Sequence, residues 1–222
     1  MKTLIKLCMG SVMAALFVLM ASPGAHAAIR LINETGKAFT VEIQTPSERL
    51  KDLSLPAGVN PSLDFKTPPG GLRYPLSIIL KSPEGEWRWD GQDNGVYLVY
   101  LSGDKYRGQY LGYIKRDASL SNWLKVWNAT KMPLNLEIFY PNGDSSKRTI
   151  QVRESASYNS PTSSYFGASD GPTATPGEKR RFEVKDNDGQ VLYKGTTTKG
   201  QVFLVMPGSG GSGISVNAVG VE

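Results

Sequence analysis

The chain has 222 residues and a net charge of +5, with 25 basic and 20 acidic side chains, one cysteine, one histidine, 24 glycines and 14 prolines. So weak a positive charge does not argue for nucleic acid as a partner. A chain of this length can bury a sizeable core, either in one large β domain or in two small ones.

Residues 1–27 have the three parts of a secretory signal. Two lysines precede an apolar run over 7–20, and the small residues Ala25 and Ala27 fit the site that a signal peptidase cleaves. We therefore predict export to the periplasm, with cleavage after Ala27. The apolar run of about 14 residues is short for a membrane span, so we do not expect the leader to remain as an anchor.

The leader contains both Cys8 and His26, so residues 28–222 have no thiol and no imidazole. Without these groups the exported chain has no Ser-His-Asp triad, no cysteine nucleophile, no disulfide and no thiolate-held metal. Glu42, Glu137 and Glu183 alternate onto the exteriors of predicted strands, which argues against the paired carboxylates of a glycosidase. We therefore predict a protein that is not an enzyme, with no catalytic residues, no metal ligands and no cofactor.

The exported part of the chain contains two copies of one unit. Residues 29–43 match residues 124–138 at a constant offset of 95, and each copy has an Asn-x-Thr segment, at 33–35 and again at 128–130. Apolar and polar residues alternate on both sides of this segment. The pattern predicts a β-hairpin or a corner with one face buried, in which the asparagine side chain bonds the backbone of the turn.

A second match continues the duplication downstream. Residues 81–91 match 185–195 and predict a hairpin that turns at a glycine, and apolar strands follow at 95–101 and 200–206. No apolar period of 3.6 residues is long enough for a long helix, and turn residues recur at the spacing of a small sandwich. The sequence therefore predicts an all-β protein made of two tandem small antiparallel β-sandwich domains of the same fold, each with about six to eight strands.

The predicted organisation has four parts. The signal peptide covers 1–27, the first sandwich 28–114, a polar linker 115–122 and the second sandwich 123–222. The second copy differs most from the first over residues 153–178, which are rich in Ser, Thr, Gly and Pro. We expect a long loop of this composition to be either functional or disordered.

Aromatic side chains are the best candidates for contact with a partner protein or a polysaccharide, because their rings stack on sugars and anchor interfaces. Trp87 and Trp89 lie on one face of a predicted strand, and they are candidates for the core as well, because Val191 and Tyr193 replace them in the second copy. The full set of candidate binding residues is Trp87, Trp89, Tyr106, Tyr110, Tyr165 and Phe166.

The opening motifs Ile-Arg-Leu-Ile-Asn at 29–33 and Leu-Lys-Val-Trp-Asn at 124–128, with the terminal pattern over 189–206, carry a resemblance. The chain resembles the periplasmic accessory protein of bacterial alginate O-acetylation and its relative in operons for acetylated cellulose. That family begins the mature chain with a short segment containing Tyr and Pro, whereas here the first strand starts directly after the leader. This departure favours the cellulose-type relative.

The resemblance implies a non-enzymatic adaptor of two β-sandwiches. Its partners would be a membrane-bound acyl-transfer protein and a periplasmic Ser-His-Asp acetyltransferase, and the exopolysaccharide chain is a further candidate. The family offers no catalytic residues to carry over. Two alternatives stay open: a polysaccharide-binding module that uses the aromatic residues, and a chaperone-like protein that pairs its edge strands with exported clients.

Overall fold

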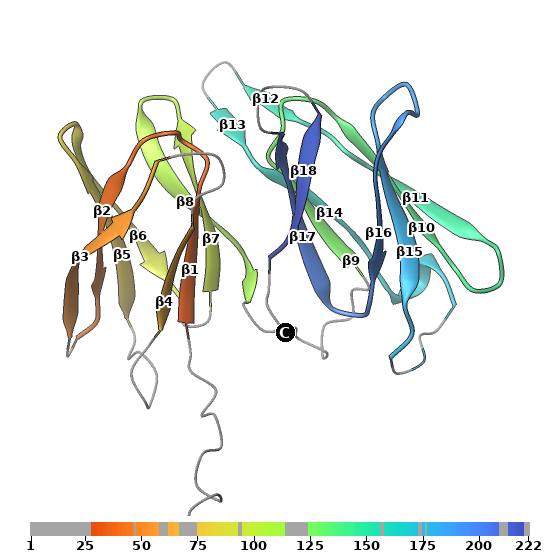
Figure 1. Ribbon diagram of the computed structural model, residues 1–222, viewed down its shortest axis with the longest axis horizontal. Coiled ribbons are helices and arrows are strands. Elements are labelled where there is room, and N and C mark those ends of the chain that lie inside the picture. Colours follow the sequence, from red (N-terminus) through yellow and green to blue (C-terminus); the bar gives the residue numbers. More distant parts are fainter. Residues whose placement is uncertain are drawn as a thin grey trace, which may run out of the picture.

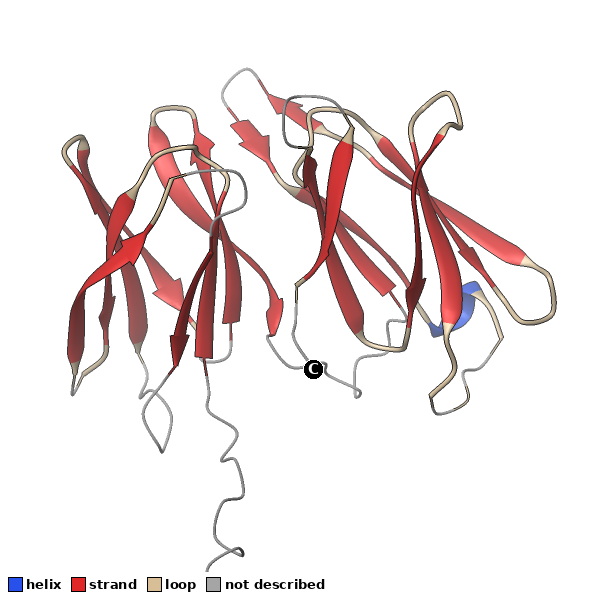
Figure 2. Cartoon of the chain, viewed as in Figure 1, coloured by secondary structure: helices blue, strands red, loops and turns tan. Residues whose placement is uncertain are grey.

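The computed structural model describes residues 28–46, 48–57, 62–66, 75–92, 95–113, 124–155, 158–172, 175, 177–208 and 213–219 (Figure 1). The predicted signal peptide and linker lie outside these residues. The described residues form β-strands and the turns that connect them, together with one short 3-10 helix, η1 (Ala168–Asp170), drawn in blue in Figure 2. None of the helical segments in these ranges is long and apolar enough to cross a membrane.

The first eight strands form a sandwich of two four-stranded sheets. The inner sheet has the order β4-β1-β7-β8 and the outer sheet the order β3-β2-β5-β6. Their bounds are β1 (Ala28–Asn33), β2 (Phe39–Gln44), β3 (Arg49–Leu55), β4 (Ser62–Lys66), β5 (Leu76–Ser82), β6 (Gly85–Gly91), β7 (Gly95–Ser102) and β8 (Lys105–Tyr113).

The remaining strands repeat this arrangement. The inner sheet has the order β14-β9-β17-β18 and the outer sheet the order β11-β10-β15-β16, while β12 and β13 form an additional hairpin. Their bounds are β9 (Leu124–Asn128), β10 (Leu134–Phe139), β11 (Ser145–Ile150), β12 (Arg153–Ser155), β13 (Tyr158–Ser160), β14 (Thr162–Phe166), β15 (Arg180–Lys185), β16 (Val191–Thr197), β17 (Gln201–Pro207) and β18 (Ile214–Ala218).

The two sandwiches share their strand order and also their register. Each contains one parallel pair, in which Asn33 lies opposite Val99 and Asn128 opposite Val205. The other strand pairs among the described residues are antiparallel. The prediction of an all-β fold built from sandwiches is confirmed. The parallel pair was not predicted, because it joins strands that lie far apart in the sequence.

The Asn-x-Thr segment is a corner between sheets and not a hairpin, because β1 and β2 belong to opposite sheets. The Asn33 Nδ2 donates to the carbonyl of Lys37 at 2.6 Å, and its Oδ1 accepts from the backbone N–H of Thr35 at 3.0 Å. Asn128 repeats both bonds with Met132 and Thr130, at 2.9 Å each. Each asparagine thus holds its corner by satisfying backbone groups that have left the sheets.

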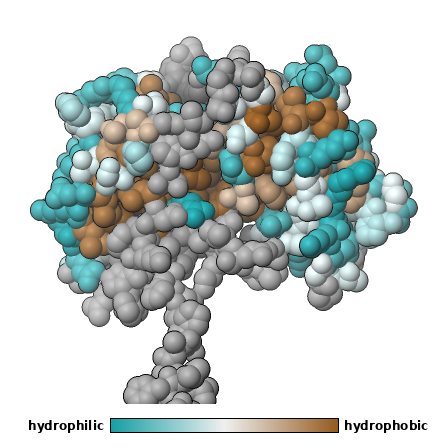
Figure 3. Space-filling view, in the orientation of Figure 1, coloured by the Kyte–Doolittle hydropathy of each residue, from teal (hydrophilic) through white to brown (hydrophobic). Residues whose placement is uncertain are grey.

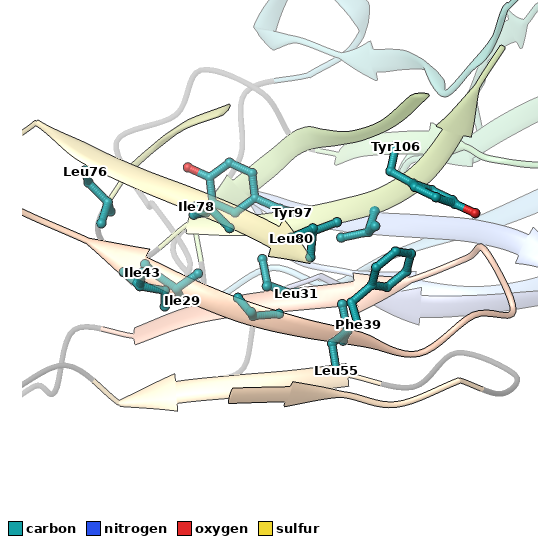
Figure 4. Packing of buried hydrophobic residues seen from close by; sticks show 12 residues of the cluster. Ile29, Leu31, Phe39, Ile43, Leu55, Leu76, Ile78, Leu80, Tyr97 and Tyr106 are labelled. Atoms are coloured by element: carbon teal, nitrogen blue, oxygen red, sulfur yellow. The ribbon is translucent and has the colours of Figure 1, made fainter. Parts of the chain in front are cut away.

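Each sandwich has its own apolar core between its inner and outer sheets. Figure 4 shows the core of the first sandwich, where Ile29, Leu31 and Tyr97 of the inner sheet meet Ile43 and Ile78 of the outer sheet. The second core uses the corresponding positions of the second copy: Leu124, Val126, Leu134, Leu136, Ile138, Tyr140, Ile150, Phe166, Phe182, Val184, Phe203 and Val205.

A third apolar core joins the two sandwiches. On β7, Tyr97 and Val99 face the first core, whereas Val96 and Leu98 lie in a buried cluster with Trp127 of β9. The other buried members of this cluster are Ile32, Leu111, Leu204, Met206 and Val219. The inner sheets are therefore buried on both faces, which explains why β7 and β17 are continuously apolar and do not alternate.

The molecule is consequently a stack of four sheets with three apolar layers between them. Copy-equivalent strands contribute to both sides of the middle layer, so the two sandwiches meet through corresponding faces, as in a symmetric dimer. The two outer sheets cover the flanks, where Figure 3 shows mostly hydrophilic residues. This packing makes one body of the two copies.

The acidic residues predicted on strand exteriors are on the outer faces but are buried there. Glu42 is only 1% exposed, because Arg49 and Lys81 cover it and bond its two carboxylate oxygens. Hydrogen bonds from Arg49, and secondarily from Lys81, lower the pKa of Glu42 to about 2. Glu137 and Glu183 are covered in the same way, and Lys185 bridges them at 2.5 and 3.2 Å. These three carboxylates therefore belong to ion pairs that stabilise the outer sheets.

The segment over 153–178 is more ordered than a loop rich in Ser, Thr, Gly and Pro suggests. Its described residues form the hairpin β12–β13, the strand β14 and the turn η1. Tyr140 donates through its hydroxyl to the carbonyl of Asp170, and Arg148 pairs with the Asp170 carboxylate. The expectation of a long irregular loop is corrected for the described residues, because β14 is an integral strand of the inner sheet; whether the segment is functional stays open at this point.

A bulge in β3 places Asp52 in the left-handed region, with φ of 60°. The free energy of unfolding of Asp52→Val is expected to be about 1–2 kcal/mol lower than that of Asp52→Gly, because a β-branched residue strains this backbone and glycine does not. Urea denaturation of the two variants measures the difference. Equal urea midpoints for the two variants would show that a β-branched residue at this position causes no strain in the folded protein.

Candidate functional site

The four aromatic candidates of the first sandwich belong to its core and its edge. Tyr106 is 5% exposed, and its ring packs edge-on against Phe39 and Trp87 at centroid distances of 4.9 and 4.7 Å. Trp87, Trp89 and Tyr110 are partly buried against the same core. The expectation of surface contact is therefore corrected for Tyr106, because the strand alternation that placed it among charges turns its ring inward.

Trp89 lies across the backbone of Gly108, where a Cβ atom would come within 2.2 Å of the indole ring. This close approach needs glycine on β8 and places the indole ring against the backbone of that strand. The core interpretation of the tryptophans thus agrees with their packing.

The two candidates on β14 point in opposite directions. Phe166 is 1% exposed and belongs to the second core, so the expectation of contact is corrected for this residue. Tyr165 is 56% exposed and lies opposite Lys125 on the neighbouring strand β9. The six aromatic residues therefore do not form one common surface.

A pocket lies elsewhere, at the seam between the two sandwiches. It has a volume of about 280 Å³ and is lined by the corner after β1, the corner after β9, the end of β7 and the base of the hairpin β12–β13. In Figure 1 this hairpin leans from the second sandwich toward the first. The lining residues are Glu34, Thr35, Tyr100, Leu101, Asn128, Ala129, Thr130, Lys131, Val152, Ser160 and Pro161.

Glu34 and Lys131 give this pocket its charge. They stand in the two copy-equivalent corners, which meet at the same end of the molecule because the sandwiches pack face to face. Desolvation raises the pKa of Glu34 to about 7, although the residue keeps access to solvent, and the positive charge of Lys131 opposes this rise. Near neutral pH the carboxyl of Glu34 therefore exchanges between its protonated and ionised forms.

The raised pKa predicts that Glu34 makes the protein less stable as pH rises. Between about pH 4.5 and 7 the folded state binds more protons at this site than the unfolded state does, so unfolding becomes easier across that window. Glu34→Gln is expected to raise the melting temperature at pH 8 and to leave it unchanged at pH 4. Thermal unfolding at a series of pH values measures this.

The control for that experiment is Glu84→Gln. A hydrogen bond from Lys37 lowers the pKa of Glu84, which is the opposite shift. The contribution of Glu84 to the stability of the protein therefore changes only in more acidic solution. Its removal should not alter the trend between pH 5 and 8. A Glu34→Gln profile parallel to that of the unaltered protein would contradict the assignment.

Sequence reasoning missed Glu34 and Lys131 as site residues. The available signal was the duplication itself, because both residues lie within or directly after the repeated Asn-x-Thr segments. The sequence does not show that the two corners meet, since this depends on which faces of the sandwiches pack together. Among the described residues no cluster of three or more acidic, histidine or cysteine side chains is placed to hold a metal ion.

Comparison with family models and with curated sequences finds no relative of this chain: no family model matches the chain, and no curated protein matches its sequence. The resemblance to accessory proteins of exopolysaccharide O-acetylation stays a prediction from the motifs.

Proposed function

We propose that this protein is a non-enzymatic periplasmic adaptor for O-acetylation of a secreted exopolysaccharide, and that it docks on the acetyltransferase proteins. The observation that carries the proposal is the way the two copies are joined. Their inner sheets are buried against each other through the third core, and this leaves one block whose outward surfaces are polar outer sheets. A block of this kind suits a protein that works by holding partners in place.

The chemistry of the chain supports the same role. Residues 28–222 contain no imidazole and no thiol, so acyl transfer through a histidine base or a cysteine nucleophile would have to come from a partner. The buried carboxylates of the outer sheets are occupied by lysine and arginine side chains. They therefore do not serve as free acids or bases.

The alternative of a chaperone-like protein that pairs edge strands has less support. The edge strand β3 carries the bulge at Asp52 together with the exposed side chains of Arg49 and Lys51. Charges and bulges on an edge oppose pairing with another strand. The edge strand β11 likewise exposes Lys147 and Arg148.

The test is a deletion strain complemented with the intact gene. The deletion is expected to secrete polymer with a strongly reduced acetyl content, and the intact gene is expected to restore it. Co-purification of a tagged copy from the complemented strain should recover an acetyltransferase. Polymer with its normal acetyl content after deletion would refute the proposal, as would turnover of acetyl esters by the purified exported chain alone.

A further inference from the structure

The pocket at the seam, defined above by its eleven lining residues, is more than a by-product of symmetric packing. Part of its lining comes from copy-equivalent corners, but Ser160 ends β13, and Val152 and Pro161 lie directly before and after the hairpin β12–β13. Only six residues connect β3 to β4, whereas eleven residues that include this hairpin connect β11 to β14. The second copy thus closes one side of the pocket with an insertion that the first copy is too short to provide.

The polar groups of the pocket are in two different states. The hydroxyls of Thr35 and Thr130 are occupied, because each bonds the asparagine of its own corner, at 2.8 and 2.7 Å. In the described part of the chain, the side chains of Glu34, Tyr100, Lys131 and Ser160 make no hydrogen bond to protein. Four polar residues from both sandwiches therefore line one cavity with no side-chain hydrogen bond to the described part of the protein.

The rest of the lining is apolar. Leu101 is 49% exposed at the end of β7, and Val152 and Pro161 stand on the opposite sandwich. A few unpaired polar groups set among apolar walls are the usual composition of a small-molecule site. At about 280 Å³ the cavity lies at the small end of such sites, so it fits one ring and not an extended chain.

We propose that this pocket binds a single neutral sugar residue, which remains part of a longer polysaccharide that leaves through the open mouth. The hydroxyl groups of a sugar both donate and accept hydrogen bonds. They therefore match the four polar side chains of the pocket, which supply a carboxyl, an ammonium and two hydroxyl groups. Leu101 and Pro161 offer contact to the C–H face of the ring. The identification of the sugar as part of an exopolysaccharide rests on the proposed function.

The charge of the pocket selects a neutral residue over a uronate. At pH 8, the pH chosen for the titration below, Glu34 is mostly ionised and faces the same cavity as Lys131, so the pocket carries no excess of positive charge to hold a carboxylate. The pocket therefore fits a cellulose-type polymer better than alginate.

The experiment is a titration of the exported chain with cellotetraose at pH 8, followed by amide chemical shifts in NMR. We expect the shifted signals to centre on residues 34, 100, 101, 131 and 160. Lys131→Met and Tyr100→Phe are each expected to weaken binding at least tenfold. Lys131 is exposed and phenylalanine keeps the Tyr100 ring, so both variants should fold, and their dispersed spectra will show it.

Lys199→Met is the matched control, since Lys199 is an exposed lysine in a turn away from the pocket, and it should bind as the unaltered chain does. No shift at 10 mM cellotetraose, or shifts that Lys131→Met leaves unchanged, would overturn the proposal. Shifts of the same residues by a mannuronate tetramer in place of cellotetraose would overturn the selection of a neutral sugar.

Failure of the sugar site and failure of the adaptor function give different results in these experiments. A protein that fails to bind cellotetraose while its deletion abolishes polymer acetylation retains the adaptor role and loses the sugar site. Binding by a protein whose deletion leaves acetylation normal gives the reverse result.

Discussion

Replacing Trp127 by alanine is expected to split the thermal unfolding of the protein into two transitions. The indole is 8% exposed in the third core, and its Nε1 donates to the carbonyl of Leu111 on the first sandwich at 2.9 Å. Loss of a large buried ring costs about 3–5 kcal/mol. Because this cost falls on the contact between the sandwiches, it removes their coupling before it removes either fold.

Calorimetry of the unaltered chain should therefore show one cooperative transition, and Trp127→Ala should show two. Trp127→Phe keeps most of the apolar contact but leaves the Leu111 carbonyl without its donor, and this costs about 1–3 kcal/mol. Comparison of Trp127→Phe with Trp127→Ala therefore separates the effect of the hydrogen bond from that of the ring.

The matched control is Tyr165→Ala, which removes an exposed aromatic ring from β14, the strand that pairs with β9. Its stability should change by less than about 0.5 kcal/mol, as is usual for exposed positions. A single unshifted transition in Trp127→Ala would show that the third core does not couple the two copies.

Much of the fold follows from local sequence pattern. The alternation on both sides of residues 33–35 and 128–130 predicts strands at the positions of β1, β2, β9 and β10. The matched glycine turns predict the hairpins β5–β6 and β15–β16, and the apolar runs at 95–101 and 200–206 agree closely with β7 and β17. These elements are defined by neighbours in the chain, so the pattern contains them. The prediction of a hairpin or corner stayed open because both begin with the same turn residues.

The four-sheet stack depends on information that the pattern holds only indirectly. Val96, Leu98, Leu204 and Met206 make two strands continuously apolar, which indicates burial on both faces. The sequence does not say what covers the second face. That the cover is the other copy, and that the two corners then enclose Glu34 and Lys131, is a consequence of tertiary packing.

Two of the six aromatic candidates, Tyr106 and Phe166, are core residues for a related reason. Tyr106 stands among charged residues in the sequence, yet strand alternation sends those charges outward and the ring inward. The presence of an aromatic residue alone does not show whether its ring lies on the surface, where it could bind a ligand, or in the core. The seam pocket, by contrast, uses common residues such as Glu, Lys and Ser, whose significance comes only from their convergence.

The buried guanidinium of Arg180 carries the other large expected effect. Its side chain is 1% exposed, donates to Glu178 at 2.7 Å and to the carbonyl of Pro172 at 2.8 Å, and lies over the ring of Tyr140 at 4.8 Å. Arg180→Met is expected to lower the free energy of unfolding by about 3–5 kcal/mol, because it leaves the Oε1 of Glu178 and the carbonyl of Pro172 without this donor and removes the positive charge beside the carboxylate. Urea denaturation measures this loss.

The neighbouring residue supplies the control. Arg181 is exposed and lies over the ring of Phe139, so Arg181→Met should cost about 1 kcal/mol or less. The double variant Arg180→Met with Glu178→Gln should recover part of the loss, because it removes the abandoned negative charge as well. Equal losses in Arg180→Met and Arg181→Met, or no recovery in the double variant, would show that the cost comes from packing and not from the buried charge.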